Sequence, residues 1–356
     1  MSELEPSITP LPVRPPRHRD RRLVGWIVTI GTALAMSRPA VLAVAAWGRP
    51  ARRAFAPSFA ERLPILLTDV LISAGVFLLG ATLGSFLNVV VFRWPRGRSP
   101  LRGRSHCPAC GQGIRALDNV PIVGWWRLGG RCRDCGAPIS ARYPIVEAIC
   151  GAIVLAVWHF EMTSGGANLP LRAIDAGAGG DWIAHRPPAD LTALMIYHCA
   201  VLLVTVVWSL VAADGGHVPW RHVAVVLVVA ALVPVIIPGL HPVPIAGTLG
   251  GAGDHLVRGA LVSAVGLATG ALAGRLVAPI IGEAWWPIAC LALWGAACGG
   301  QGALTLTGVL LGLVGLDRLA ARLTTWLPVP ASWLLLAAAV VQLLAWRQIH
   351  HLIWPA

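Results

Sequence analysis

Long apolar runs separated by arginine-rich loops are the feature that most limits how this chain can fold. A helix needs about 20 apolar residues to cross a bilayer. Only 12% of the residues are charged and 56% are hydrophobic, whereas a soluble domain has about 25% charged residues. The pattern predicts an all-α polytopic membrane protein. Its candidate spans are roughly 24–47, 68–92, 145–160, 191–213, 222–240, 256–281, 285–302, 303–323 and 331–347.

Two parts of this pattern leave alternatives open. The runs 285–302 and 303–323 are joined by CGGQG with no polar loop, so they are either two spans or one broken helix. The run 24–47 either spans the membrane or lies as a hairpin at its surface. The second alternative arises because the arginines after this run would otherwise be outside the cell; they are Arg49, Arg52, Arg53 and Arg62.

The longest polar insert covers residues 93–143 and carries a strong excess of positive charge. It contains ten arginines and only two acids, Asp118 and Asp134. Cytoplasmic loops of membrane proteins are enriched in basic residues, so we expect this insert to be cytoplasmic. The same distribution explains the net charge of +12 and argues against nucleic-acid binding. We expect the basic loops to meet membrane lipid.

These features divide the chain into four regions. Residues 1–66 are a basic N-terminal extension with one apolar segment, and residues 67–160 form a domain around the polar insert. Residues 161–190 are expected to form a Gly/Pro-rich loop on the opposite side of the membrane. Residues 191–350 form the remaining membrane domain.

Four cysteines in the insert have metal-ligand spacing. Cys107, Cys110, Cys132 and Cys135 follow the pattern C-x2-C-x21-C-x2-C. Four thiolates can surround Zn²⁺ tetrahedrally, and the glycine after each pair, Gly111 or Gly136, relieves the tight turn. The pattern predicts a structural zinc site, with a metal-free, redox-active tetrathiol as the alternative. The other cysteines lie in apolar runs and are predicted to be buried free thiols: Cys150, Cys199, Cys290 and Cys298.

The sequence around the cysteines resembles a known family. Residues 84–95 read GSFLNVVVFRWP, residues 118–132 read DNVPIVGWWRLGGRC, and residues 136–151 read GAPISARYPIVEAICG. This series is similar to the amino-terminal half of type IV prepilin peptidases, the leader peptidase/N-methyltransferases of type IV pili and type II secretion. The resemblance implies an inner-membrane protein with about eight transmembrane helices and a cytoplasmic four-Cys zinc loop.

The catalytic half departs from the family pattern. The family cleaves prepilins with two aspartates, one before a proline and one in Gly-x-Gly-Asp at the start of a later helix. Such a dyad shares a proton, so that one carboxylate acts as base and the other as acid. Pro219 matches the family's proline, but Ala212 occupies the first aspartate position. Gly300 and Gly302 match Gly-x-Gly, and Ala303 occupies the second.

Two other acids offer a competing dyad. Asp214 matches an accessory aspartate of the family, and Asp254 ends a literal Gly-x-Gly-Asp. We therefore carry three hypotheses. The chain is a non-proteolytic family member that binds prepilin-like proteins or assists a secretion or pilus apparatus. Otherwise it is an active aspartic peptidase using Asp214 and Asp254, or a zinc-stabilised scaffold unrelated to pilins. S-adenosylmethionine is expected only if methyltransferase activity is retained.

Overall fold

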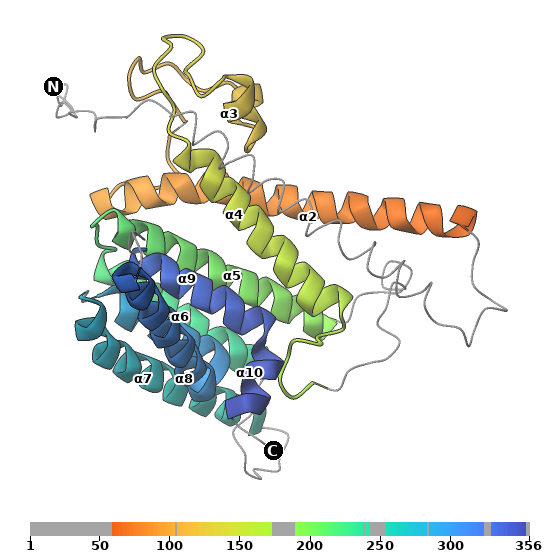
Figure 1. Ribbon diagram of the computed structural model, residues 1–356, viewed down its shortest axis with the longest axis vertical. Coiled ribbons are helices and arrows are strands. Elements are labelled where there is room, and N and C mark those ends of the chain that lie inside the picture. Colours follow the sequence, from red (N-terminus) through yellow and green to blue (C-terminus); the bar gives the residue numbers. More distant parts are fainter. Residues whose placement is uncertain are drawn as a thin grey trace. The chain divides into compact units, whose positions relative to one another are not determined.

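A computed structural model describes residues 59–103, 105–172, 189–237, 239–241, 254–282, 285–323 and 329–353 (Figure 1). Within these residues the regular structure is helical, apart from two isolated β-bridges. The run 24–47 lies outside the described residues, so its span or hairpin alternatives stay open. The chain forms two compact units. One contains the described residues up to Val89 together with Ser99–Leu155, and the other contains Val90–Arg98 and the chain from Ala156 onward.

The first unit is built on two helices that flank the polar insert. Helix α2 is Phe59–Arg93, and helix α4 is Arg142–Val157. The insert between them contains two short helices, η3 (Ala116–Asn119) and α3 (Val123–Arg127) (Figure 1). A short 3₁₀ turn, η2 (Trp94–Arg96), follows α2 directly in the chain.

Glycines allow α2 and α4 to approach closely. A Cβ atom at Gly80 would lie 2.8 Å from the carbonyl oxygen of Cys150, and one at Gly84 would lie 2.9 Å from the Cα of Glu147. On the opposing helix, a Cβ at Gly151 would meet the ring of Phe77 at 2.8 Å. Small residues four apart in this way are typical of helix pairs inside membranes. The glycine that opens the GSFLN motif therefore has a packing role.

The second unit is a helical bundle made from the rest of the chain (Figure 1). Its helices are α5 (Ala189–Ala213), α6 (Trp220–Ile236), α7 (Asp254–Ile281), α8 (Trp286–Leu323), α9 (Ala331–Leu344) and α10 (Trp346–Ile353). Before them, α4 continues into a π-helix, η4 (Trp158–Thr163). The first residues of the expected loop 161–190 are therefore still helical.

The tightest helix contact in this unit joins α7 to α8. A Cβ at Gly266 would lie 1.9 Å from the carbonyl oxygen of Gly295, and one at Gly270 would lie 2.0 Å from that of Leu291. A Cβ at Gly274 would likewise meet Ile288 at 2.5 Å. These three glycines are spaced by four residues, so they share one face of α7. The small residues of this stretch serve close packing, as membrane helices without a hydrophobic driving force require.

Five described helices are long and apolar enough to cross a membrane. They are Leu67–Arg96, Arg142–Thr163, Ala189–Ala213, His255–Ile281 and Trp286–Leu323. A sixth is possible if α9 and α10, which meet at 87°, form one broken span, and α6 is a shorter apolar helix. The expected number of about eight spans stays a prediction. Of the two alternatives at 285–323, the structure shows the broken helix: α8 consists of two helical segments that meet without a loop at Gly299, whose φ of +76° and ψ of 174° are non-helical.

The four cysteines outside the insert lie in helices and are free thiols, as expected. Cys150, Cys290 and Cys298 are buried, whereas Cys199 is only partly buried.

Candidate metal centre and the polar groups of the membrane half

Two turns with the same backbone hydrogen bonds carry the four cysteines. In the first turn, Cys107 N donates to Gln112 O at 2.9 Å and Gly111 N donates to Cys107 O at 2.8 Å. In the second turn, Cys132 N donates to Ala137 O at 2.8 Å and Gly136 N donates to Cys132 O at 3.0 Å. The second turn repeats the first 25 residues later in the chain.

The glycine in each turn has the conformation that the sequence predicts. Gly111 and Gly136 both have φ +71°, a left-handed value that glycine adopts without steric cost. An isolated β-bridge closes each turn, His106 with Gly113 and Arg131 with Pro138. The predicted function of the two glycines is therefore confirmed.

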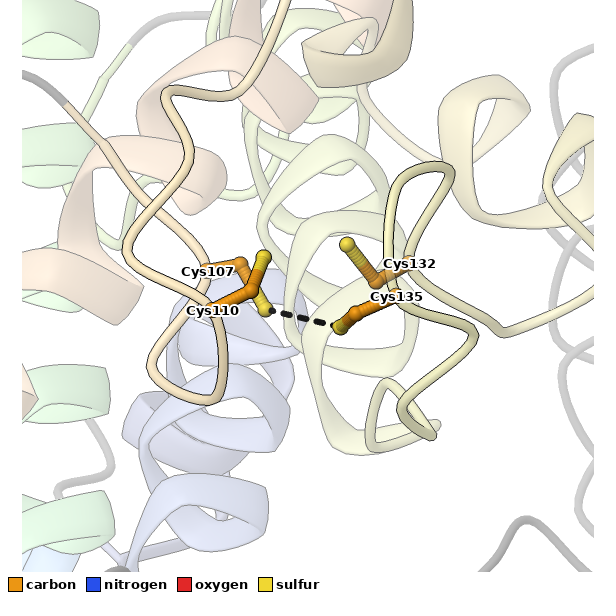
Figure 2. A group of neighbouring side chains, drawn as sticks. All are labelled: Cys107, Cys110, Cys132 and Cys135. Atoms are coloured by element: carbon orange, nitrogen blue, oxygen red, sulfur yellow. Dashed lines mark hydrogen bonds between the residues drawn. The ribbon is translucent and has the colours of Figure 1, made fainter.

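The two turns face one another and bring the four sulfur atoms together (Figure 2). All four sulfurs lie within 4.8 Å of one another, and those of Cys107 and Cys135 are 3.9 Å apart. A tetrahedral Zn²⁺ with bonds of about 2.3 Å places its sulfurs about 3.8 Å apart. The donor set and its spacing fit zinc. In this site the metal would cross-link two loop turns that share no long helix or sheet.

The local backbone favours the thiolate form of one cysteine in this cluster, Cys132. For Cys110 and Cys135, a backbone hydrogen bond lowers the pKa of the thiol, but burial and the neighbouring sulfur atoms outweigh it; they raise the pKa of Cys110 to about 12 and also raise the pKa of Cys135. Backbone N–H groups of Cys135 and Asp134 hydrogen-bond the Cys132 sulfur and lower the pKa of its thiol to about 7. A thiolate is the form that binds a metal. Cys132 is thus prepared for ligation near neutral pH.

A buried aspartate holds the insert together beside the cysteines. Asp118 accepts hydrogen bonds from Arg127 at 2.8 Å and from Arg133 at 2.5 Å, and its side chain is only 5% exposed. These two guanidinium groups, Arg133 first, hold the pKa of the Asp118 carboxyl well below its usual range. The pairing connects η3 to α3 and to the second cysteine turn.

The motif residues at both ends of the insert serve as attachments. Glu147 on α4 accepts a hydrogen bond from the backbone N of Ile122 at 2.6 Å. Ile122 has φ +64° and is the one non-glycine residue with positive φ in the described part of the chain. Asn88 on α2 donates to the carbonyl oxygen of Tyr143 at 3.3 Å. The Asn and Glu of the family-like motifs therefore anchor the insert to its helices.

The positions expected for catalytic aspartates hold no carboxylate. Ala212 lies in the last turn of α5, and Asp214 follows it in an exposed turn. Gly299 is non-helical, with φ +76° and ψ 174°, and divides α8 into two helical segments. The resemblance places Gly-x-Gly-Asp at a helix start, and Gly300 and Gly302 do open the second segment, directly after this break. Ala303, at the aspartate position, lies in the first turn of that segment and is fully buried. The start of α8 does not supply the missing acid either, since its first turn contains no acidic residue.

Of the two aspartates in the competing dyad, the structure describes the side chain of one. Asp214 is exposed, and Asp254 is the first residue of α7, with its side chain outside the described part of the structure. Among the described residues, the four cysteines are the group of side chains that come close enough together to hold a metal ion. The histidines near the two aspartates, His217, His222 and His255, do not form such a group there.

A buried pair in the membrane half was missed from the sequence. The Oε1 of Glu161 on η4 lies 2.6 Å from the Nδ1 of His198 on α5, and the side chains are 0% and 1% exposed. The sequence placed Glu161 at the edge of a polar loop, because the Gly/Pro-rich stretch begins just after it. The helical continuation through η4 carries Glu161 inward. No spacing rule connects two residues 37 positions apart, so only the fold reveals the pair.

Comparisons with known proteins agree with the resemblance read from the sequence. Residues 78–160 match the family model described as the Bacterial Peptidase A24 N-terminal domain. A prepilin leader peptidase/N-methyltransferase of Myxococcus xanthus is 45% identical over 92 residues, which cover 24% of this chain and 28% of the relative. A type 4 prepilin-like proteins leader peptide-processing enzyme of Escherichia coli is 45% identical over 100 residues, covering 22% of this chain and 37% of the relative.

A third relative extends the match slightly. The prepilin leader peptidase/N-methyltransferase of Klebsiella pneumoniae is 41% identical over 106 residues, covering 28% of this chain and 44% of the relative. The chain thus matches less than half the length of each of these relatives. No solved structure matches the chain significantly.

Proposed function

We propose that this chain is a membrane protein of the prepilin peptidase family, and that it binds prepilin-like proteins without cutting them. The match over residues 78–160 supports the family part of this proposal. In this proposal the zinc loop is an intact family scaffold and the aspartyl centre is degenerate. The loop is cytoplasmic and the protein lies in the bacterial inner membrane, as the arginine excess of 93–143 favours. Prepilins or a secretion or pilus apparatus are its partners.

One observation carries the proposal: alanine occupies both expected aspartate positions. Ala212 and Ala303 place a methyl group where the dyad needs a carboxylate, and the first turn of α8 has no acid that replaces it. Without two acids that share a proton, water has neither the base that activates it nor the acid that protonates the leaving amine.

The other described acids of the second unit support this reading, because several are already engaged. Glu161 pairs with His198, and Asp190 pairs with Arg172 at 2.7 Å. Asp317 accepts a hydrogen bond from the backbone N of Val329 at 3.2 Å. Their partners give each a structural role.

The test is co-expression with a prepilin in cells that lack their own prepilin peptidase. We expect the wild-type chain to leave the leader attached, while the Myxococcus xanthus relative serves as positive control. We also expect the uncut prepilin to copurify with the wild-type chain. Removal of the leader by the wild type would contradict the proposal, and loss of that cleavage in Asp214→Ala or Asp254→Ala would identify the dyad.

Copurification separates the proposal from the scaffold hypothesis. If neither cleavage nor copurification is found with any prepilin tested, the third hypothesis, a scaffold unrelated to pilins, is favoured. Transfer of a labelled methyl group from S-adenosylmethionine to a prepilin already trimmed by the relative would show that methyltransferase activity is retained. The prepilin incubated without the chain is the control.

A further inference from the structure

The zinc loop exposes apolar side chains at a regular interval. Leu117, Val120, Val123 and Trp126 follow one another every three residues and are 68%, 38%, 55% and 52% exposed. The first two lie in or just after the 3₁₀ helix η3, where residues three apart share a side. The last two lie three apart on α3, where they are also neighbours. We refer to these four residues as the apolar stripe.

The stripe belongs to an ordered part of the loop. Helices η3 and α3 pack so closely that a Cβ at Gly124 would lie 2.2 Å from the carbonyl oxygen of Asp118. Trp125, next to Trp126 in the chain, is buried and donates its Nε1–H to Ile139 O at 3.0 Å. Two adjacent tryptophans therefore have opposite environments. The outward position of Trp126 is fixed by the packing of its neighbour.

The loop that carries the stripe has a net positive charge. Residues 99–141 contain six arginines and two aspartates. Both aspartates are already paired inside the loop, Asp118 with Arg127 and Arg133, and Asp134 with Arg115 at 3.3 Å. Few negative charges remain to face outward. A basic surface with exposed aromatic and aliphatic side chains has the composition of segments that lie on anionic membranes.

The chain connectivity keeps this surface near a bilayer. The span that precedes the loop ends at Arg96, and the span that follows begins at Arg142. A loop between two consecutive spans leaves and re-enters the membrane on the same side, so it is held at that leaflet. An anionic lipid surface is therefore always within reach, whereas a soluble acidic partner has to be recruited.

We propose that the apolar stripe inserts into the headgroup region of anionic lipids, with the net positive charge of the loop attracted to the phosphates. Trp126 is the deepest anchor, because the indole ring favours the membrane interface. The loop is then a peripheral membrane element as well as a zinc module. This inference does not depend on whether the chain cuts, binds or ignores prepilins.

The experiment uses the full chain labelled with 5-fluorotryptophan and reconstituted in nanodiscs. Trp126→Phe identifies the ¹⁹F resonance of Trp126, and its unchanged zinc content and Trp125 resonance show that the loop remains folded. Two relaxation agents report the environment: a 5-doxyl phosphatidylcholine in the bilayer and a gadolinium chelate in the buffer. Trp125 is the internal control, since it is buried and one residue away.

We expect the lipid agent to broaden the Trp126 resonance and the aqueous agent to leave it narrow. The lipid effect should increase several-fold when about 30% of the phosphatidylcholine is replaced by phosphatidylglycerol. It should weaken in about 0.5 M salt, which screens the arginines. The double variant Leu117→Gln/Val123→Gln should lose most of the effect while keeping its zinc.

Two results would overturn the inference. In the first, the aqueous agent broadens Trp126 and the lipid agent does not, in both lipid compositions. In the second, Trp126 is protected from the aqueous agent only after a prepilin is added. That result would assign the stripe to a protein partner.

Discussion

The four-cysteine loop and the membrane half of this chain are each stabilised by polar contacts, but the contacts within the two regions are of different kinds. In the loop, partners lie close in sequence: each cysteine turn closes within a few residues, and Asp118 meets Arg127 and Arg133. In the membrane half, partners come from distant positions and are buried, as with Glu161 and His198. This difference shows that the structure of the loop is determined by a local sequence pattern, whereas the structure of the membrane half is determined by tertiary packing.

Removal of the metal should have the largest effect, because we expect it to destabilise the loop and to leave the membrane half folded. We expect Cys107→Ser/Cys132→Ser to remove zinc, because two of its four ligands are lost. The loop should then be cleaved by protease at least about tenfold faster, since metal binding supplies folding energy to small zinc modules. The membrane half should keep its helices by circular dichroism.

The matched control for this variant is Cys199→Ser, which removes a thiol outside the cluster. It should retain zinc by elemental analysis and resist protease like the wild type. An unchanged cleavage rate in the double variant would show that the loop is stable without metal.

In the membrane half, the next largest effect should come from the α7–α8 contact. Gly266→Ala puts a methyl group within 1.9 Å of a carbonyl oxygen on α8, and overpacking of this kind costs about 3 kcal/mol. Gly308→Ala is the matched control, because no atom lies within 4 Å of the Cβ it adds. Thermal unfolding in detergent measures both. Equal midpoints for the two variants would mean that the helices pack differently.

A smaller effect should follow from breaking the buried pair. Glu161→Ala leaves the Nδ1 of His198 without its partner, and an unsatisfied buried polar group costs about 1–3 kcal/mol. Replacing both residues by apolar side chains, Glu161→Leu/His198→Leu, should restore part of the lost stability. The free energies of unfolding of Glu161→Leu, His198→Leu and their double variant give the coupling between the two side chains. A purely additive result would show that the two side chains do not interact.

The smallest effect should come from Asp118→Asn. The pKa of Asp118 is lowered in the fold, so its contribution is present above the ordinary carboxyl pKa and is lost only as pH falls through the lower folded value. Between about pH 6 and pH 8 the variant should therefore be destabilised by a constant amount. The protease sensitivity of residues 97–141 measures it. A difference that disappears within that range would contradict the pairing with Arg127 and Arg133.

The part of this molecule that could be predicted from the sequence is the loop in which the interacting residues lie a few positions apart in the chain. The four cysteines and the glycines that follow them are read directly from their spacing. The motif residues Asn88 and Glu147 could be recognised, but their function as anchors for the loop required the helices to be placed side by side. Hydrophobicity alone does not determine where a helix ends, so Glu161 was assigned to a loop although η4 carries it into the interior.

The place of Ala303 is a second case in which a local pattern was sufficient. The Gly-x-Gly match predicts that Gly300 and Gly302 open a helix, and they follow directly on the non-helical Gly299, where the second segment of α8 begins. Glycine adopts the positive φ of this break without steric cost. The burial of Ala303, in contrast, depends on the helices packed around it and could not be read from the motif.

The contacts of Arg347 have a consequence for the order in which the chain is assembled. Its side chain donates hydrogen bonds to the carbonyl oxygens of Leu169 and Arg172, and its backbone N donates to Asn168 O. A ribosome makes residue 347 long after it has made these acceptors. The carbonyl oxygens of the segment after η4 must therefore stay without these bonds until α10 has been made, and water or another donor has to satisfy them until then.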